Sequence, residues 1–119
     1  MFKEIHQEVV DSSDGAVAGL LMGYDGIPIE KYVRDGGSMD VESIGMELSV
    51  VLKDIRKAAE MLHAGTAREV AIRAERLTTV IRLLNDEYFL AVALEPSGNA
   101  GKARFLVRLR SSALVEALG

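Results

Sequence analysis

The stretch that decides the fold is LLMGYDGIPIE, residues 20–30, in which Asp25-Gly26 separates two apolar runs. Asp-Gly between apolar runs is a strong signal for a β-hairpin, because a type I′ turn needs positive φ at both central positions. Asp25 could also be read as a catalytic acid, but turn chemistry explains it without any partner. Pro28 has no N–H to give to a sheet, so the returning strand, residues 27–34, is predicted to be an edge strand. A two-residue turn would place Gly23 opposite Pro28.

Around this hairpin the chain forms an ordered series of predicted helices and strands. Apolar periodicity predicts helices at residues 2–12, 40–64 and 99–118, and strands at 16–24, 69–75, 78–84 and 87–94. Strand 87–94 is apolar on both faces, which is typical of a central strand covered on both sides. The links within each strand group are short, so the sheet is predicted to be antiparallel. Residues 35–38, DGGS, are predicted to be a loop.

The predicted helices have identifiable ends and buried faces. Asp40 is a predicted N-cap and Gly65 a predicted C-cap of the long helix. Its core-facing stripe is predicted to comprise Val41, Ile44, Leu48, Val51, Leu52, Ile55, Ala59 and Leu62. The stripe of the last helix is predicted to comprise Ala103, Leu106, Leu109, Ala113, Leu114 and Ala117. Phe105, Val107 and Leu109 also alternate as in a strand, but the Ala, Leu and Arg content favours helix.

Composition bounds the class of protein. The 119 residues are 49% hydrophobic, so residues 1–119 are expected to form a single domain with a substantial core. The net charge is -4, from 14 basic and 18 acidic residues, which argues against a nucleic-acid partner. The chain has no Cys, its start has no signal-peptide core, and no apolar run approaches the ~20 residues of a membrane span. We expect a soluble, cytoplasmic protein.

The sequence offers no recognisable catalytic or metal-binding constellation. His6 and His63 each lie near the end of a predicted helix, without partners at metal-ligand spacing, and are predicted to be surface residues. No serine lies in a GxSxG elbow. The stretch PSGNAGKA, residues 96–103, lacks P-loop spacing, so Gly98, Asn99, Gly101 and Lys102 are read as a helix cap rather than an anion site. We expect no catalytic residue, no metal ligand and no cofactor.

The long helix carries more apolar residues than one buried face requires. Met46, Val50 and Met61 fall on the side opposite the main stripe, interspersed with Lys53, Asp54 and Lys57. Scattered apolar surface residues are normal, but a strip that includes two methionines also suits an adaptable partner surface. We therefore take these six residues as candidate partner contacts.

The strand at residues 69–75 is a second candidate interaction element. If it forms the other edge of the sheet, its unpaired backbone must be protected by charge, covered or paired. Its members are Glu69, Val70, Ala71, Ile72, Arg73, Ala74 and Glu75. The charged side chains either protect this edge or take part in pairing across a two-fold axis.

Several stretches together resemble the Roadblock/dynein light chain family along essentially the whole chain. They are AVAGLLMGYDGIPIEKYVRD (16–35), the long helix after it, TTVIRLLNDEYFLAVAL (78–94) and GNAGKARFLVRLR (98–110). The family shows an apolar strand, a DG turn and a returning strand, and later a central apolar strand. A final helix then begins near a Gly and carries an Arg, here Arg104. The ordered combination carries the resemblance, since no single motif is specific.

The resemblance implies an α/β (α+β) fold, a profilin-like Roadblock sandwich with element order α-β-β-α-β-β-β-α. It implies a five-stranded antiparallel sheet of order 2-1-5-4-3, with the first and last helices on one face and the long helix on the other. It further implies dimerisation, in which strands 69–75 of two copies join edge to edge and the helices 40–64 lie side by side.

The resemblance also implies a function. Family members serve as dynein light chains, as scaffolds for Ras-like GTPases, and as bacterial regulators of such GTPases in gliding motility and polarity. We therefore expect a non-enzymatic, bacterial-type module that binds or regulates a small Ras-like GTPase, as a homodimer or a heterodimer with a paralogue. One alternative is a small-ligand sensor, which would need a polar-lined cavity. Another is a hydrolase that binds an anion at residues 98–102.

Overall fold

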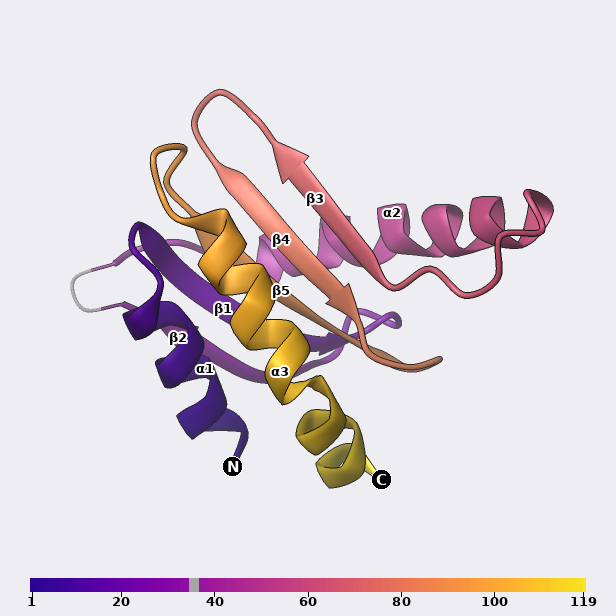
Figure 1. Cartoon of the computed structure of the whole chain (residues 1–119), viewed down its shortest axis with the longest axis horizontal. Helices are drawn as coiled ribbons and strands as arrows, with labels where there is room; N and C mark the ends of the chain where they lie inside the picture. The colour runs from indigo at the N-terminus through magenta and orange to yellow at the C-terminus, as the bar shows by residue number, and fades with distance from the viewer. Residues whose placement is uncertain (35–36) are drawn as a thin grey trace.

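In the computed structural model, which describes residues 1–34 and 37–119, three helices cover the two faces of a five-stranded sheet. Figure 1 shows the elements, which are α1 (Phe2–Ser12), β1 (Ala16–Gly23), β2 (Pro28–Val33), α2 (Val41–Met61), β3 (Glu69–Arg73), β4 (Thr78–Leu83), β5 (Tyr88–Leu94) and α3 (Ala100–Leu118). All strand pairs are antiparallel and the order is β2-β1-β5-β4-β3. The predicted fold and strand order are confirmed. Of the predicted loop 35–38, residues 35–36 lie outside the described residues.

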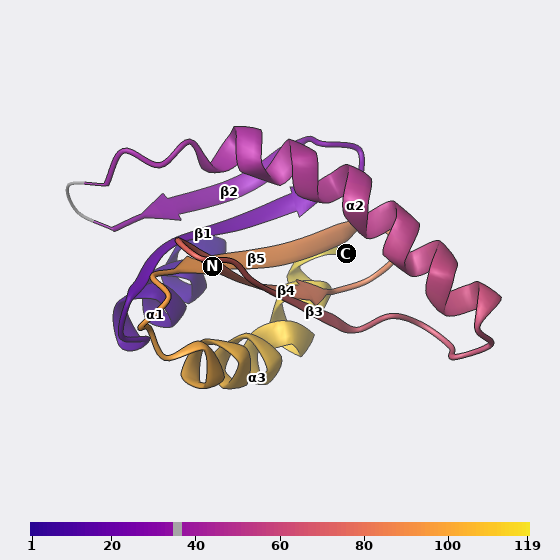
Figure 2. The same ribbon diagram turned by 90° about the horizontal axis from the view of Figure 1, so that it is seen from above.

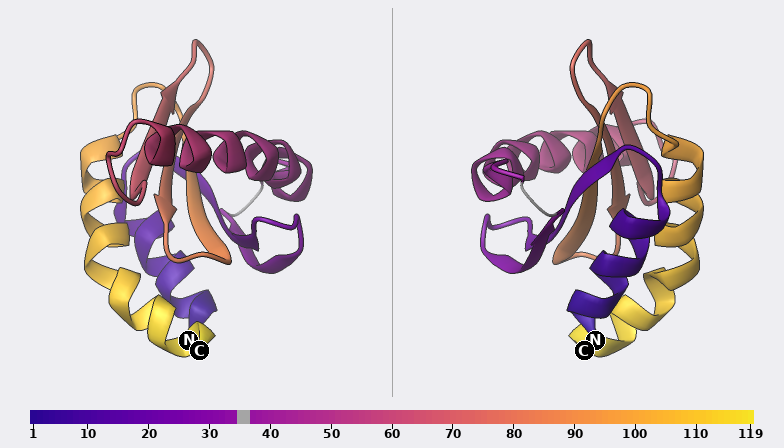
Figure 3. Two further views of the ribbon diagram at one scale, coloured as in Figure 1. Left: turned by 90° about the vertical axis from the view of Figure 1, so that its right-hand side faces the viewer. Right: turned by 90° about the vertical axis from the view of Figure 1, so that its left-hand side faces the viewer.

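The sheet separates two hydrophobic cores, so the molecule has three layers (Figure 2). Alternation along β5 supplies both cores: Leu90 and Val92 pack beneath α1 and α3, while Phe89 and Ala91 pack beneath α2. This confirms that the doubly apolar run 87–94 contains the central strand. On the first face α1 and α3 lie side by side (Figure 3).

The β1–β2 hairpin has a different turn from the one predicted. The Gly23 N–H donates to the Ile27 carbonyl oxygen and the Gly26 N–H to the Gly23 carbonyl oxygen, both at 2.9 Å. Gly26 has a φ of 87°, whereas Asp25 has a negative φ and its Oδ1 accepts from the Ile27 N–H at 3.1 Å. This is a three-residue loop that ends in a left-handed glycine, not a type I′ turn. The extra residue shifts the register, so that Met22, not Gly23, lies opposite Pro28.

The ends of two elements differ from prediction. Helix α2 ends at Met61 and its C-cap is Leu62, so the predicted cap Gly65 lies beyond the helix end; His63 and Gly65 are both left-handed, with φ of 55° and 84°. Strand β3 ends at Arg73, because the Ala74 N–H donates to the Leu77 carbonyl oxygen at 3.0 Å and begins a tight turn. Ala74 and Glu75 therefore lie outside the strand to which they were assigned.

Helix α3 is a helix throughout, so the strand alternative at residues 105–109 is wrong. Asn99 caps it, accepting from the Lys102 N–H at 3.0 Å. Its buried face differs from the predicted stripe: Val107 is buried, whereas Leu109, Ala113 and Ala117 are exposed. The helix packs against both α1 and the sheet, so it buries a wider sector than a single stripe.

Candidate interaction surface

Helix α2 begins at its predicted cap and approaches the sheet closely. Asp40 accepts from the Ser43 N–H at 3.2 Å and from the Ser43 hydroxyl at 2.7 Å, and these bonds hold the pKa of its carboxyl below the usual range. Gly45 faces β1, where an added Cβ would collide with Leu20 and lie 2.9 Å from the Met22 sulfur. The missing side chain therefore lets α2 approach β1.

The buried face of α2 is rotated from its predicted position. Its buried residues are Val41, Gly45, Leu48, Ser49 and Leu52. At ~100° per residue their centre lies roughly 60° from the centre of the predicted apolar stripe, because small Gly45 and Ser49 face the sheet. Val51 and Leu62, assigned to the core from the sequence, are instead 45% and 75% exposed. The uncovered apolar surface is thus wider than predicted.

The predicted partner strip lies in the open on α2. Met46, Val50 and Met61 are 58%, 60% and 73% exposed, and the charged residues Lys53, Asp54 and Lys57 are exposed as well. The last turns of α2 project beyond the strands (Figures 1 and 2). We define the α2 strip as Met46, Val50, Lys53, Asp54, Lys57 and Met61.

The Arg56 side chain connects α2 to the turn after β1 and the turn after β4. The Arg56 guanidinium donates to the Asp86 carboxylate at 3.2 Å and lies 4.4 Å from the centre of the Tyr24 ring. Tyr24 packs against Phe89 with ring centres 5.6 Å apart, and burial raises the pKa of its phenol. These contacts attach α2 to the rest of the molecule at Arg56, and the side of the helix that faces away from the sheet stays exposed.

Strand β3 presents an unpaired backbone edge within the described residues. It is the last strand of the sheet and hydrogen-bonds to β4 alone. The Leu83 N–H donates to the Arg68 carbonyl oxygen and the Ala74 N–H to the Leu77 carbonyl oxygen, each at 3.0 Å. Because an antiparallel ladder alternates, the intervening Glu69, Ala71 and Arg73 direct their backbone groups away from β4. These groups form a free pairing edge.

The side chains of β3 divide between the two faces of the sheet. Val70 is half-buried and packs against the core beneath α2, next to Ile72, which is 40% exposed. Glu69 points to the other face, where the Arg104 guanidinium binds it side-on at 3.0 and 2.7 Å. The loop 62–68 runs from α2 to β3, and the last turns of α2 lie on the β3 side of the sheet (Figure 1).

The two histidines occupy different environments. His6 is 1% exposed, so its assignment to the surface is wrong; burial beneath α1 lowers its pKa to about 4. His6 lies on the buried side of α1 together with Val9 and Val10. The sequence did not indicate this burial, because a histidine between the polar residues of an amphipathic helix is ordinarily exposed. His63 is exposed at the end of α2. Across residues 1–34 and 37–119 no three His, Cys, Asp or Glu side chains are grouped to hold a metal ion.

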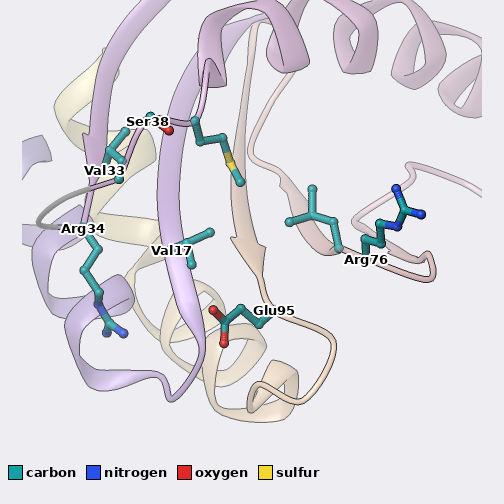
Figure 4. A pocket seen from close by; sticks show the side chains of 9 residues that line it. Val17, Val33, Arg34, Ser38, Arg76 and Glu95 are labelled. Carbon is teal, nitrogen blue, oxygen red and sulfur yellow. The ribbon is translucent and has the colours of Figure 1, made fainter.

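A hollow of about 520 Å³ bears on the ligand-sensor alternative. Its wall includes Val17 and Val33, with Arg34, Arg76 and Glu95 at its margin (Figure 4). The two arginines point apart, and the Arg34 guanidinium donates instead to the Val10 carbonyl oxygen at 2.6 Å. Ligand pockets bring polar groups together on one molecule, and this arrangement does not favour a sensor.

The start of α3 is occupied by structural contacts. The Asn99 side chain accepts from the Lys102 N–H, and the Asn99 N–H donates to the Asp14 carbonyl oxygen at 2.7 Å. The backbone of Gly98 packs against Gly15. Gly101 and Lys102 are exposed on the first turn. Of the residues that the hydrolase alternative would use, these contacts account for Gly98, Asn99 and the Lys102 N–H. In the described chain no helix is both long and apolar enough to span a bilayer.

Comparison with known proteins identifies solved structures that are similar to this chain. No family model and no curated protein matches the sequence. A crystal structure of MglC from Myxococcus xanthus is 34% identical, covers 98% of each chain and superposes with a TM-score of 0.71. The gliding protein MglB from Thermus thermophilus is 16% identical over 96% of this chain and 85% of that one, with a TM-score of 0.85. A Roadblock/LC7 domain from Streptomyces avermitilis is 14% identical over 97% and 95%, with a TM-score of 0.84.

Proposed function

Given that the chain belongs to the Roadblock/dynein light chain family, we propose that it is a dimeric, non-enzymatic module that binds or regulates a small Ras-like GTPase. The observation that carries the proposal is the α2 strip, whose large apolar residues are exposed, in a molecule whose strand β3 also has a free backbone edge. Adaptable Met-containing surfaces suit protein partners. In this proposal residues 1–119 form one cytoplasmic domain without a cofactor.

Dimerisation uses β3. Two copies of the strand pair antiparallel across a two-fold axis, and the outward backbone groups of Glu69, Ala71 and Arg73 exchange hydrogen bonds. A pairing centred on Ala71 sets Glu69 of one copy opposite Arg73 of the other, and the reverse. Opposite charges facing each other across paired strands are favourable, so the edge is complementary to itself. This supports a homodimer over a heterodimer with a paralogue.

The GTPase platform uses α2. Joining the β3 edges brings the two long helices together on one face of a continuous sheet, with both α2 strips facing outward. Val51 and Leu62 flank each strip and supply apolar area to the seam between the helices. One structural neighbour is described as a gliding protein, which supports a bacterial role in motility. The chain would act by holding or positioning the GTPase, without a catalytic side chain of its own.

The test compares two aspartate substitutions of matched exposure. Val50→Asp places a charge in the α2 strip, while Leu109→Asp places one at a 54% exposed position of α3 on the opposite face. Ras-like GTPases of the same cell, loaded with GDP or a non-hydrolysable GTP analogue, are titrated against immobilised protein. We expect Val50→Asp to weaken capture at least tenfold, because a desolvated charge costs more than ~1.4 kcal/mol. Leu109→Asp should bind as the wild type does. Equal binding by both variants, or capture of no GTPase by the wild type, would defeat the proposal.

A further inference from the structure

Two basic hollows lie along α3 on the face of the sheet opposite the α2 strip. Their volumes are about 220 and 550 Å³, and they lie one helical turn apart, between α3 and the β3–β4 side of the sheet. Four arginines from three parts of the chain line them: Arg68 before β3, Arg82 on β4, and Arg104 and Arg108 on α3. We call these hollows the arginine groove.

Three of the four guanidinium groups form no ion pair in the described part of the chain. Within residues 1–34 and 37–119, Arg68, Arg82 and Arg108 form no ion pair, and only Arg104 has a partner, Glu69. The groove contains four arginines against two glutamates, Glu69 and Glu116, in a chain whose net charge is -4. The groove therefore carries an excess of positive charge although the whole chain is acidic, and this excess raises the local concentration of anions there.

Glu69 shows which chemistry the groove accepts. Arg104 holds its carboxylate side-on, at 3.0 and 2.7 Å, in the geometry that guanidinium groups prefer. The hydrogen bond from Arg104, followed by the charges of Arg104, Arg82 and Arg108, lowers the pKa of this carboxyl against the effect of its burial. One carboxylate of the chain already lies among three guanidinium groups, and the remaining groups can take more.

The shape of the groove favours a peptide over other anions. It extends from Gly101 to Glu116 of α3, roughly 22 Å at 1.5 Å per residue, far longer than one small anion requires. Phe105, Leu84 and Val115 add apolar wall between the charges. An extended peptide in which carboxylates alternate with apolar residues matches both features. A nucleic acid or an anionic membrane would extend over the rest of the chain, whose net charge is negative, whereas a short peptide lies within the groove, and charges more than about 8 Å away from it are screened.

We propose that the arginine groove is a docking site for an acidic, partly apolar peptide segment of a partner protein. This goes beyond the GTPase platform, because the two surfaces lie on opposite faces of the sheet. Glu69 competes within the chain for Arg104, so it sets the affinity of the site. Binding is strongest at low salt, as exposed charge pairs require.

The probe is a fluorescein-labelled peptide of about eight residues with alternating Glu and Leu, long enough to span the groove when extended. Fluorescence anisotropy compares the wild type with Arg82→Gln/Arg108→Gln. The control Lys3→Gln/Arg76→Gln removes the same charge outside the groove. We expect the first variant to bind about tenfold more weakly and the control less than about twofold. Glu69→Gln, which frees Arg104, should bind about threefold more tightly.

Each alternative result overturns the proposal. Equal losses in the two double variants would show that only net charge matters. Unchanged binding when Gln replaces Glu in the peptide would exclude carboxylate recognition. Vesicles containing phosphatidylserine, or a single-stranded oligonucleotide, that bind groove-dependently while the peptide does not would assign the groove to a membrane or a nucleic acid. A change in oligomer mass in Arg82→Gln/Arg108→Gln would assign it to a second copy of this chain.

Discussion

Substituting Ala71 with Pro tests the edge-to-edge dimer most directly. Ala71 lies at the centre of β3, and its N–H points away from β4. Proline at this position removes an outward donor and leaves the β3–β4 ladder intact, as at an ordinary edge position. The folded monomer should therefore lose less than about 1 kcal/mol of unfolding free energy.

The dimer should lose considerably more. Pairing centred on Ala71 would form about six interchain backbone hydrogen bonds, of which the two Ala71 N–H groups donate two. At about 0.5–1.5 kcal/mol net for each bond, their loss costs about 1–3 kcal/mol. That corresponds to a dimer dissociation constant raised roughly 5- to 150-fold, before any clash of the proline ring is added.

Sedimentation equilibrium measures the dissociation constant, and thermal unfolding by circular dichroism checks the fold. Lys31→Pro is the matched control, because Lys31 lies on β2 at the opposite edge and the same alternation directs its N–H outward. We expect this control to dissociate as the wild type does. The reasoning fails if Ala71→Pro leaves the dissociation constant within twofold, or if Lys31→Pro weakens the dimer equally.

Three further outcomes follow from individual contacts. Gly45→Ala should cost about 1–3 kcal/mol in urea unfolding, because its Cβ would collide with Leu20; an unchanged midpoint would contradict the close approach of α2. Arg56→Gln should cost about 1 kcal/mol through its lost contacts with Tyr24 and Asp86, and a cost near zero would show that they do not hold α2. Burial depresses the pKa of His6 to about 4, so the stability it contributes is complete above its unfolded value near 6.5 and falls as the pH drops towards 4. Urea unfolding at pH 7 and pH 4.5 should show about 3 kcal/mol at most of such loss, reduced in His6→Leu; equal acid sensitivity in both would refute it.

The edge position of β2 and the central position of β5 could be predicted from the residues, because each depends on features that the stretch carries by itself. Pro28 cannot donate to a neighbour, so it marked an edge wherever the rest of the chain lay. Residues 87–94 are apolar on both faces, so the strand within them had to be covered twice. The turn between β1 and β2 was located correctly, but its type was not, because Asp-Gly also serves a three-residue loop with the glycine left-handed.

The surface of α2 could be predicted only in part. Its outer strip follows from helical period, since Met46, Val50 and Met61 lie opposite any face centred near Val41. Hydrophobicity, however, gives no weight to Gly45 or Ser49, and it was their small size that turned this side of the helix toward β1. Val51 and Leu62 were consequently assigned to the core and are exposed.

The sequence by itself determined the order of the elements, the edge of the sheet at Pro28, the doubly covered centre of the sheet and the outer strip of the long helix. These follow from local periodicity and from single residues with special backbone chemistry. Only the tertiary structure decided the rotation of α2, the burial of His6 and the gathering of Arg68, Arg82, Arg104 and Arg108 in one groove. Those features depend on which surfaces meet across the sheet, and residues far apart in sequence become neighbours only through packing.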